Sequence, residues 1–122
     1  MQNYQDLFKL ELYENEEPIN FYRVLNQEQK ADPDLFLIPI SIVSRIVHIG
    51  YGYQLKYCSL IDVYGEIDLG PMQLKTLNEE LSLIIDLVND SVLRHYLVPL
   101  IEFIKPCLNN KNNYIVIRIV VA

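Results

Sequence analysis

The sequence predicts an α+β fold, in which a mainly antiparallel sheet carries two long helices packed on one face. Two adjacent segments, residues 71–88 and 92–108, have apolar residues that recur at helical spacing. The segment after them, residues 114–122, is apolar on both faces, which is typical of a strand inside a sheet. A chain of 122 residues is an ordinary size for one domain with its own core, so we expect residues 1–122 to form a single domain.

The N-terminal part of the chain predicts one strand, one ambiguous segment and a turn. Residues 5–13 alternate between apolar and polar side chains, as expected of a strand with one buried side. Its apolar face consists of Phe8, Leu10 and Leu12. Residues 19–30 fit a short helix capped by Asn20, and a strand over residues 19–25 is the alternative. The Pro and Asp content of residues 31–34 indicates a turn.

The middle of the chain predicts a helix followed by a long strand. Residues 35–49 are rich in β-branched residues, which by propensity alone favours a strand. However, Pro39 suits the first turn of a helix, Gly50 suits a C-terminal cap, and apolar residues between them recur at helical spacing. We therefore expect a helix over residues 39–49. The alternation over residues 53–64 then predicts a long strand.

The start of the second half gives clear signals for a turn and a helix. All four glycines fall between residues 50 and 70, so turns with a positive φ are expected there. Residues 66–69 continue as a short extended piece, and Pro71 is well placed to begin the first long helix. Its core stripe consists of Leu74, Leu77, Leu81, Ile84, Ile85 and Val88. Asp90 or Ser91 can cap the second long helix.

The C-terminal part predicts the second long helix and the central strand. Within residues 92–108, Pro99 removes a backbone donor and predicts a kink, and Pro106 is expected to help end the helix. Residues 114–122 are apolar on both faces apart from Arg118, so we place this strand in the centre of the sheet.

Composition argues against several classes of function and location. The net charge is −6 and the Lys and Arg residues do not cluster, which argues against binding to nucleic acid. No apolar run approaches the roughly 20 residues that span a bilayer, and the polar N-terminus is unlike a signal peptide, so we expect a cytoplasmic protein with no membrane association. Cys58 and Cys107 are expected to be buried free thiols, with a disulfide between them as the alternative.

No combination of residues points to catalysis, to a metal or to a cofactor. Asp62, Glu66 and Asp68 gather around a strand end, but no Lys follows them at the spacing of magnesium-dependent nuclease sites. His48 and His95 each stand apart from other potential metal ligands. We therefore expect a protein that is not an enzyme, with no catalytic residues, no metal and no cofactor.

Two features favour binding to another protein. The first is the polar side of the helix over residues 71–88 and its end, where three acidic residues surround an apolar one. These residues are Glu79, Asp86, Asp90 and Leu83. The second is a group of tyrosines around the glycine-rich turns, at Tyr51, Tyr53, Tyr57 and Tyr64. Tyrosines, and single apolar residues ringed by charge, are common at interfaces. The alternatives are that another element covers Leu83 and that the tyrosines pack on the sheet.

The order of elements from Tyr64 to Val121 adds a resemblance. A strand leads through Asp68-Leu69-Gly70-Pro71 into a Leu-rich acidic helix, followed by a second helix, an Asn/Lys turn and a terminal strand. This layout resembles the small α+β immunity proteins of bacterial toxin systems. The resemblance implies a cytoplasmic, non-enzymatic protein that binds and blocks a toxin, often a basic nuclease.

Two other functions stay open at this point. One is a small enzyme or ligand-binding protein with a pocket lined by tyrosines and acidic residues from the middle of the chain. The other is a structural subunit that forms a homodimer and buries Leu83 and Leu87 in the contact. Among these, we expect a protein-binding domain with a basic partner.

Overall fold

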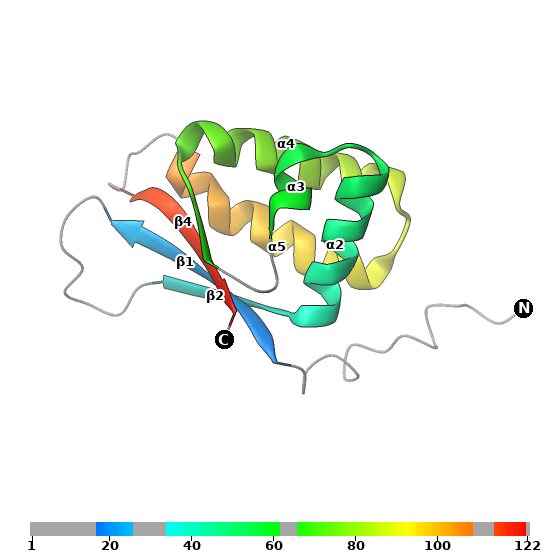
Figure 1. The fold of residues 1–122 in the computed structure, drawn as a ribbon, viewed down its shortest axis with the longest axis horizontal. Coiled ribbons are helices and arrows are strands. Elements are labelled where there is room, and N and C mark those ends of the chain that lie inside the picture. The colour runs from blue at the N-terminus through cyan, green and yellow to red at the C-terminus, as the bar shows by residue number, and fades with distance from the viewer. Residues whose placement is uncertain (1–16, 26–33, 62–65, 109–113, 122) are drawn as a thin grey trace, which may run out of the picture.

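One four-stranded antiparallel sheet and a layer of helices make up the fold, as Figure 1 shows. The computed structural model describes residues 17–25, 34–61, 66–108 and 114–121. The elements are β1 (Pro18–Leu25), β2 (Asp34–Pro39), α2 (Ile40–Gly52), α3 (Lys56–Leu60), β3 (Glu66–Leu69), α4 (Pro71–Leu87), α5 (Ser91–Leu108) and β4 (Tyr114–Val121). The α+β fold with two long helices, α4 and α5, is therefore confirmed. The strand predicted for residues 5–13 and most of the turn predicted for residues 31–34 lie outside the described residues.

The strands lie in the order β2-β1-β4-β3, and every neighbouring pair is antiparallel. β4 lies between β1 and β3, so the central position predicted for the terminal strand is confirmed. Alternate residues of β1 and β4 turn toward the helices and are fully buried. They are Ile19, Phe21, Ile117 and Ile119. Pairing with two neighbouring strands explains why the strand over residues 19–25 is right and the capped helix is wrong there.

β2 leads directly into α2, which begins at Ile40. The helix predicted over residues 39–49 is confirmed, but it continues through Gly50 to Gly52, so the cap expected at Gly50 is wrong. Packing explains this glycine: a Cβ on Gly50 would lie 2.7 Å from the backbone nitrogen of Ser59. The absence of a side chain at Gly50 therefore lets α3 approach α2 closely.

The long strand predicted over residues 53–64 is wrong, because residues 56–60 form the short helix α3. The alternation of apolar residues there does not reflect a sheet. Cys58 and Ile61, three residues apart, are buried in the core, as on one side of a helical turn. The turn before α3 uses a positive φ of 58° at Gln54, and none of the described glycines has a positive φ. The glycine turns expected from the sequence are thus wrong for the described residues.

α4 and α5 carry the largest part of the core. The first four residues of the predicted α4 stripe, Leu74, Leu77, Leu81 and Ile84, are fully buried, and Ile85 and Val88 pack against the core from its side. α4 begins at Pro71 as expected, and the side chain of Gln73 accepts a hydrogen bond from the backbone N–H of Gly70 at 2.9 Å. α5 contains both Pro99 and Pro106 and runs on to Leu108. Within the described part of the chain, no helix is long and apolar enough to cross a membrane.

Candidate protein-binding surface

The outward side of α4 combines two exposed leucines with two exposed carboxylates. Leu83 keeps 42% and Leu87 46% of its surface exposed, although the opposite side of the same helix is fully buried. Glu79 lies four residues before Leu83, and Asp86 three residues after it. Side chains at these spacings are neighbours on a helix. We call Glu79, Leu83, Asp86 and Leu87 the outer strip of α4.

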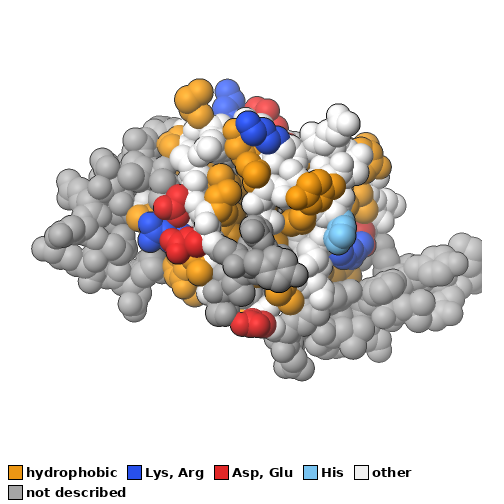
Figure 2. Space-filling model, viewed as in Figure 1, with side chains coloured by type: hydrophobic (Ala, Val, Ile, Leu, Met, Phe, Trp, Pro, Cys, Tyr) orange, Lys and Arg blue, Asp and Glu red, His pale blue; other side chains and the backbone are white. Residues whose placement is uncertain are grey.

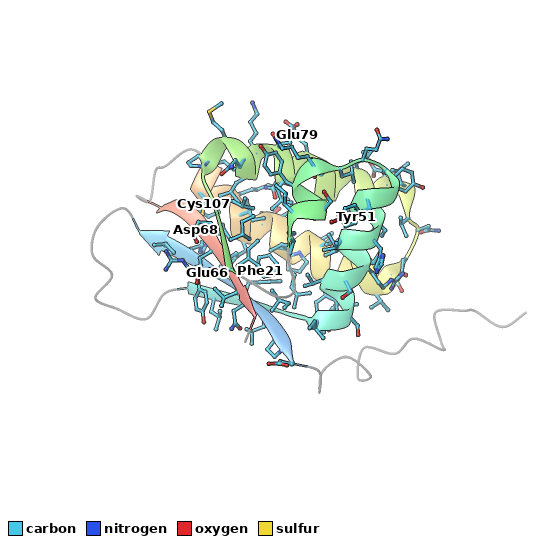
Figure 3. All side chains as sticks on the ribbon, viewed as in Figure 1. Phe21, Tyr51, Glu66, Asp68, Glu79 and Cys107 are labelled. Carbon is cyan, nitrogen blue, oxygen red and sulfur yellow. The ribbon has the colours of Figure 1, made fainter. Side chains whose placement is uncertain are left out.

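Both carboxylates of the outer strip are exposed to solvent. Neither Glu79 nor Asp86 forms an ion pair with another described residue. Lys75, one turn before Glu79, is the exposed basic residue of the same helix. Figure 3 shows Glu79 at the outer margin of the helical layer, where it is exposed to solvent. In Figure 2, charged side chains gather at this margin and beside β3, and apolar side chains occupy much of the surface between them.

Asp90 forms its contacts within the fold. Its carboxylate forms an ion pair with Arg45 of α2 and accepts hydrogen bonds from the N–H groups of Val92 at 2.9 Å and Leu93 at 3.2 Å. Burial acts to raise the pKa of Asp90, but the hydrogen bonds from Arg45, Leu93 and Val92 outweigh it and hold this pKa below its ordinary value. Asp90 therefore caps α5, as predicted, and joins it to α2, so we leave it out of the outer strip.

The tyrosines lie on a neighbouring element. Tyr51 lies in the last turn of α2 and Tyr53 follows as its C-cap, and both side chains are exposed. Figure 3 shows Tyr51 projecting from α2, and α3 contacts both α2 and α4. Tyr57 differs from them because it is half-buried against the core. Tyr64 lies outside the described residues. Two of the four tyrosines in the predicted group, Tyr51 and Tyr53, thus remain candidates for a contact surface.

Glu80 is an important residue that the sequence reasoning missed. It is one of two buried polar residues among those described, and its Oε1 accepts hydrogen bonds from the N–H groups of Tyr57 at 3.0 Å and Cys58 at 2.9 Å. α3 has no capping side chain of its own, so a carboxylate from α4 takes that place. The signal was present in the sequence, since Glu80 interrupts the apolar pattern three residues after Leu77 and four before Ile84.

The acidic cluster near β3 is held by an arginine. Arg118 of β4 donates to Asp68 through Nε at 2.9 Å and through a terminal nitrogen at 3.1 Å, and its Nε lies 3.0 Å from Glu66. The hydrogen bond and charge of Asp68, with the charge of Glu66, raise the pKa of Arg118. Figure 3 shows both carboxylates side by side on β3, and Asp62 lies outside the described residues. The ion pairs of Arg118 therefore link β4 to β3.

The thiols are buried and free. Cys58 and Cys107 form no disulfide, so the predicted free thiols are confirmed and the alternative disulfide is wrong. Burial is the main cause that raises the pKa of both, to about 11 for Cys107, and Glu80 adds to the effect at Cys58. Both thiols therefore stay protonated near neutral pH, and a protonated thiol is a poor nucleophile.

The histidines lie on the surface. His48 and His95 are exposed, and the ring of His95 contacts Tyr96 edge-on with 5.1 Å between ring centres. Within the described residues, no three His, Cys, Asp or Glu side chains are grouped so that they could hold a metal ion.

Comparison with known proteins gives no relative: no family model, curated protein or solved structure matches the chain. The outer strip of α4 is therefore the candidate site on geometry alone, and Tyr51 and Tyr53 are exposed at the end of α2 in the same helical layer.

Proposed function

We propose that the chain is a non-enzymatic, cytoplasmic protein-binding domain that holds its partner against the outer strip of α4. The observation that carries this proposal is the pair of half-exposed leucines beside two carboxylates that have no described ion-pair partner. Removing the remaining exposed surface of each leucine from water contributes about 1 kcal/mol to binding. Carboxylates at the margin then select the partner by charge and speed its approach.

The partner that fits this surface has a basic face with an apolar residue or pocket inside it. The net charge of −6 attracts such a protein at long range. The resemblance to immunity proteins supports a specific class, a basic toxin domain whose working surface is covered in the complex. Tyr51 and Tyr53 extend the contact in the proposal, because exposed tyrosines lose little conformational freedom on binding and make large apolar contacts.

Charge reversal on the outer strip tests the proposal. The full chain is immobilised, the protein it captures from its own host is identified and purified, and dissociation constants are measured by calorimetry. Glu79→Lys combined with Asp86→Lys should weaken binding on the order of 100-fold, because like charges then face each other across the contact. The control is Glu17→Lys with Glu102→Lys, two exposed carboxylates elsewhere, which changes the net charge by the same amount. Glu102 also loses its exposed ion pair with Lys105, which contributes little to stability.

Other outcomes count against the proposal. Equal affinities for the two double variants would place the contact elsewhere on the molecule. If the wild-type chain forms a dimer in light scattering and Leu83→Asp returns it to a monomer, the outer strip is a contact between two copies of this chain. That result would replace the proposed binder by the homodimeric subunit.

A further inference from the structure

The two edges of the sheet differ in how they are protected. Among the described strands, β2 and β3 are the edges. β3 has only four residues, and two of them are the carboxylates Glu66 and Asp68, held in place by Arg118. Short length and charge are the devices by which natural edge strands avoid pairing with another chain. The β3 edge is therefore protected.

β2 is neither very short nor rich in charge. It has six residues, and the five from Leu35 to Pro39 carry no charge. Its pairing with β1 runs without a register shift from Pro18↔Pro39 to Arg23↔Asp34, so no bulge interrupts the strand. A regular, uncharged edge strand presents its outer backbone groups as a template for one more strand.

The side chains of β2 point alternately to the two faces of the sheet. Ile38 is fully buried and Phe36 packs against Phe103 of α5, with 5.5 Å between ring centres, so these two residues face the helices. Leu35 and Leu37 point the other way and keep 47% and 48% of their surface exposed. Among the described strands, the open face of the sheet thus has two exposed leucines on its edge strand β2.

We propose that β2 pairs with β2 of a second copy of this chain, antiparallel and about a two-fold axis at Phe36, so that the two sheets become continuous. In this register Leu35 lies opposite Leu37 of the second copy, and Leu37 opposite Leu35. All four leucines then share one face, where each cross-strand pair contributes roughly 0.2–1 kcal/mol beyond the backbone hydrogen bonds.

This register brings no like charges opposite each other. In the same register Asp34, the one charged residue of β2, lies opposite Ile38 of the second copy. The two Asp34 positions are therefore four residues apart along the strands, about 13 Å. Tyr22 of β1 pairs with Leu35 in the register of each sheet and continues the apolar row away from the axis. A second copy thus supplies matching leucines at matching positions without bringing like charges together.

The second copy leaves the outer strip of α4 open. Leu35 and Leu37 lie on the face of the sheet opposite to Phe36 and Ile38, which face the helices. The outer strip belongs to α4, which lies in the helical layer on the other side of the sheet (Figure 1). The inference is therefore independent of the proposed partner. Six residues per strand make a small interface, so we expect a dissociation constant on the order of micromolar.

Sedimentation velocity of the full chain over a hundredfold range of concentration tests the dimer. The wild type should pass from the 14.3 kDa monomer to twice that mass. Leu35→Lys with Leu37→Lys should stay monomeric throughout, because four like charges would meet in the dimer. Met72→Lys with Val98→Lys is the matched control: both are exposed apolar residues on helices, and the dimer should persist. Circular dichroism and thermal melting verify that each variant is folded.

Two results would overturn the inference. The first is a wild type that is monomeric over the whole range; dimerisation of Phe8→Lys with Leu10→Lys would then assign the β2 edge to the N-terminal segment of the same chain. The second is a dimer that survives Leu35→Lys with Leu37→Lys but is lost with Leu83→Asp, which places the contact on α4.

Discussion

At the scale of single residues, Glu80 does the most to hold the candidate surface in place. A helix of five residues has little stability of its own, because too few hydrogen bonds repay the ordering of its backbone. The carboxylate of Glu80 satisfies two N–H groups at the start of α3 and thereby fixes α3 to α4. Because α3 also packs on the last turn of α2, Glu80 indirectly positions Tyr51 and Tyr53.

Replacing Glu80 by Ala should lower the free energy of unfolding by about 2–3 kcal/mol, because buried N–H groups of Tyr57 and Cys58 lose a charged acceptor. Urea denaturation measures this change. The neighbouring Glu79→Ala removes an exposed carboxylate and should change the same quantity by less than about 0.5 kcal/mol. Similar losses in the two variants would contradict the capping role of Glu80.

Asp90 gives the fold a dependence on pH with a defined sign. Its pKa is lower in the folded than in the unfolded chain, so the unfolded state takes up a proton first as the pH falls. The stabilisation by the charged Asp90 is complete well above its ordinary pKa of 3.8 and is lost as the pH falls below that value through the folded-state pKa.

Asp90→Asn isolates this charge, because Asn is also a good N-cap. Denaturant unfolding of both proteins between pH 7 and pH 2 measures the effect. The wild type should be the more stable protein at pH 7, and the difference should shrink as the pH falls below about 4. A difference that is constant over the whole range would show that the charge of Asp90 contributes nothing.

At the scale of elements, the close packing of α3 on α2 depends on Gly50. Gly50→Ala places a Cβ 2.7 Å from the backbone nitrogen of Ser59 and 2.9 Å from the Cβ of Cys58, so backbone must move. We expect a loss of about 2 kcal/mol in the free energy of unfolding. Gly52→Ala is the matched control, since nothing lies within 4 Å of its added Cβ, and it should be neutral or stabilising by up to about 1 kcal/mol. Equal free energies of unfolding for the two variants, measured by chemical denaturation, would contradict this packing.

The elements also show which parts of the fold the sequence could predict. The core stripe of α4, the cap of α5 at Asp90 and the apolar run of β4 are local signals, and these elements form where they were expected. α3 was missed because its helix depends on Glu80, more than 20 residues away. β1 was ambiguous because pairing with β2 and β4, which local spacing does not reveal, decides between strand and helix.

At the candidate site too, local spacing was predictable from the sequence and long-range contacts were not. Helical spacing placed Glu79, Leu83 and Asp86 on one exposed side of α4, and the structure has them there. Nothing local to Asp90 predicted its ion pair with Arg45, which comes 45 residues earlier in the chain. Contacts over such distances decide whether an acidic residue is free to meet a partner or is used within the fold.

At the scale of the whole molecule, the sheet separates two apolar surfaces with different properties. The outer strip of α4 mixes leucines with carboxylates that pair with no other described residue, as suits a partner of opposite charge. The edge at β2 offers uncharged backbone and leucines, as suits an identical strand. A dimer through β2 would present two copies of the outer strip, so a partner with two sites would bind more tightly than one with a single site.

The central claim is that the outer strip of α4 is the surface that meets the partner. The most direct measurement is the ratio of two dissociation constants for the captured partner, that of Glu79→Lys with Asp86→Lys divided by that of Glu17→Lys with Glu102→Lys. Net charge and the number of substitutions are equal in the two proteins, so this ratio reports only where the charges lie. The account predicts a ratio on the order of 100. A ratio near one would contradict it.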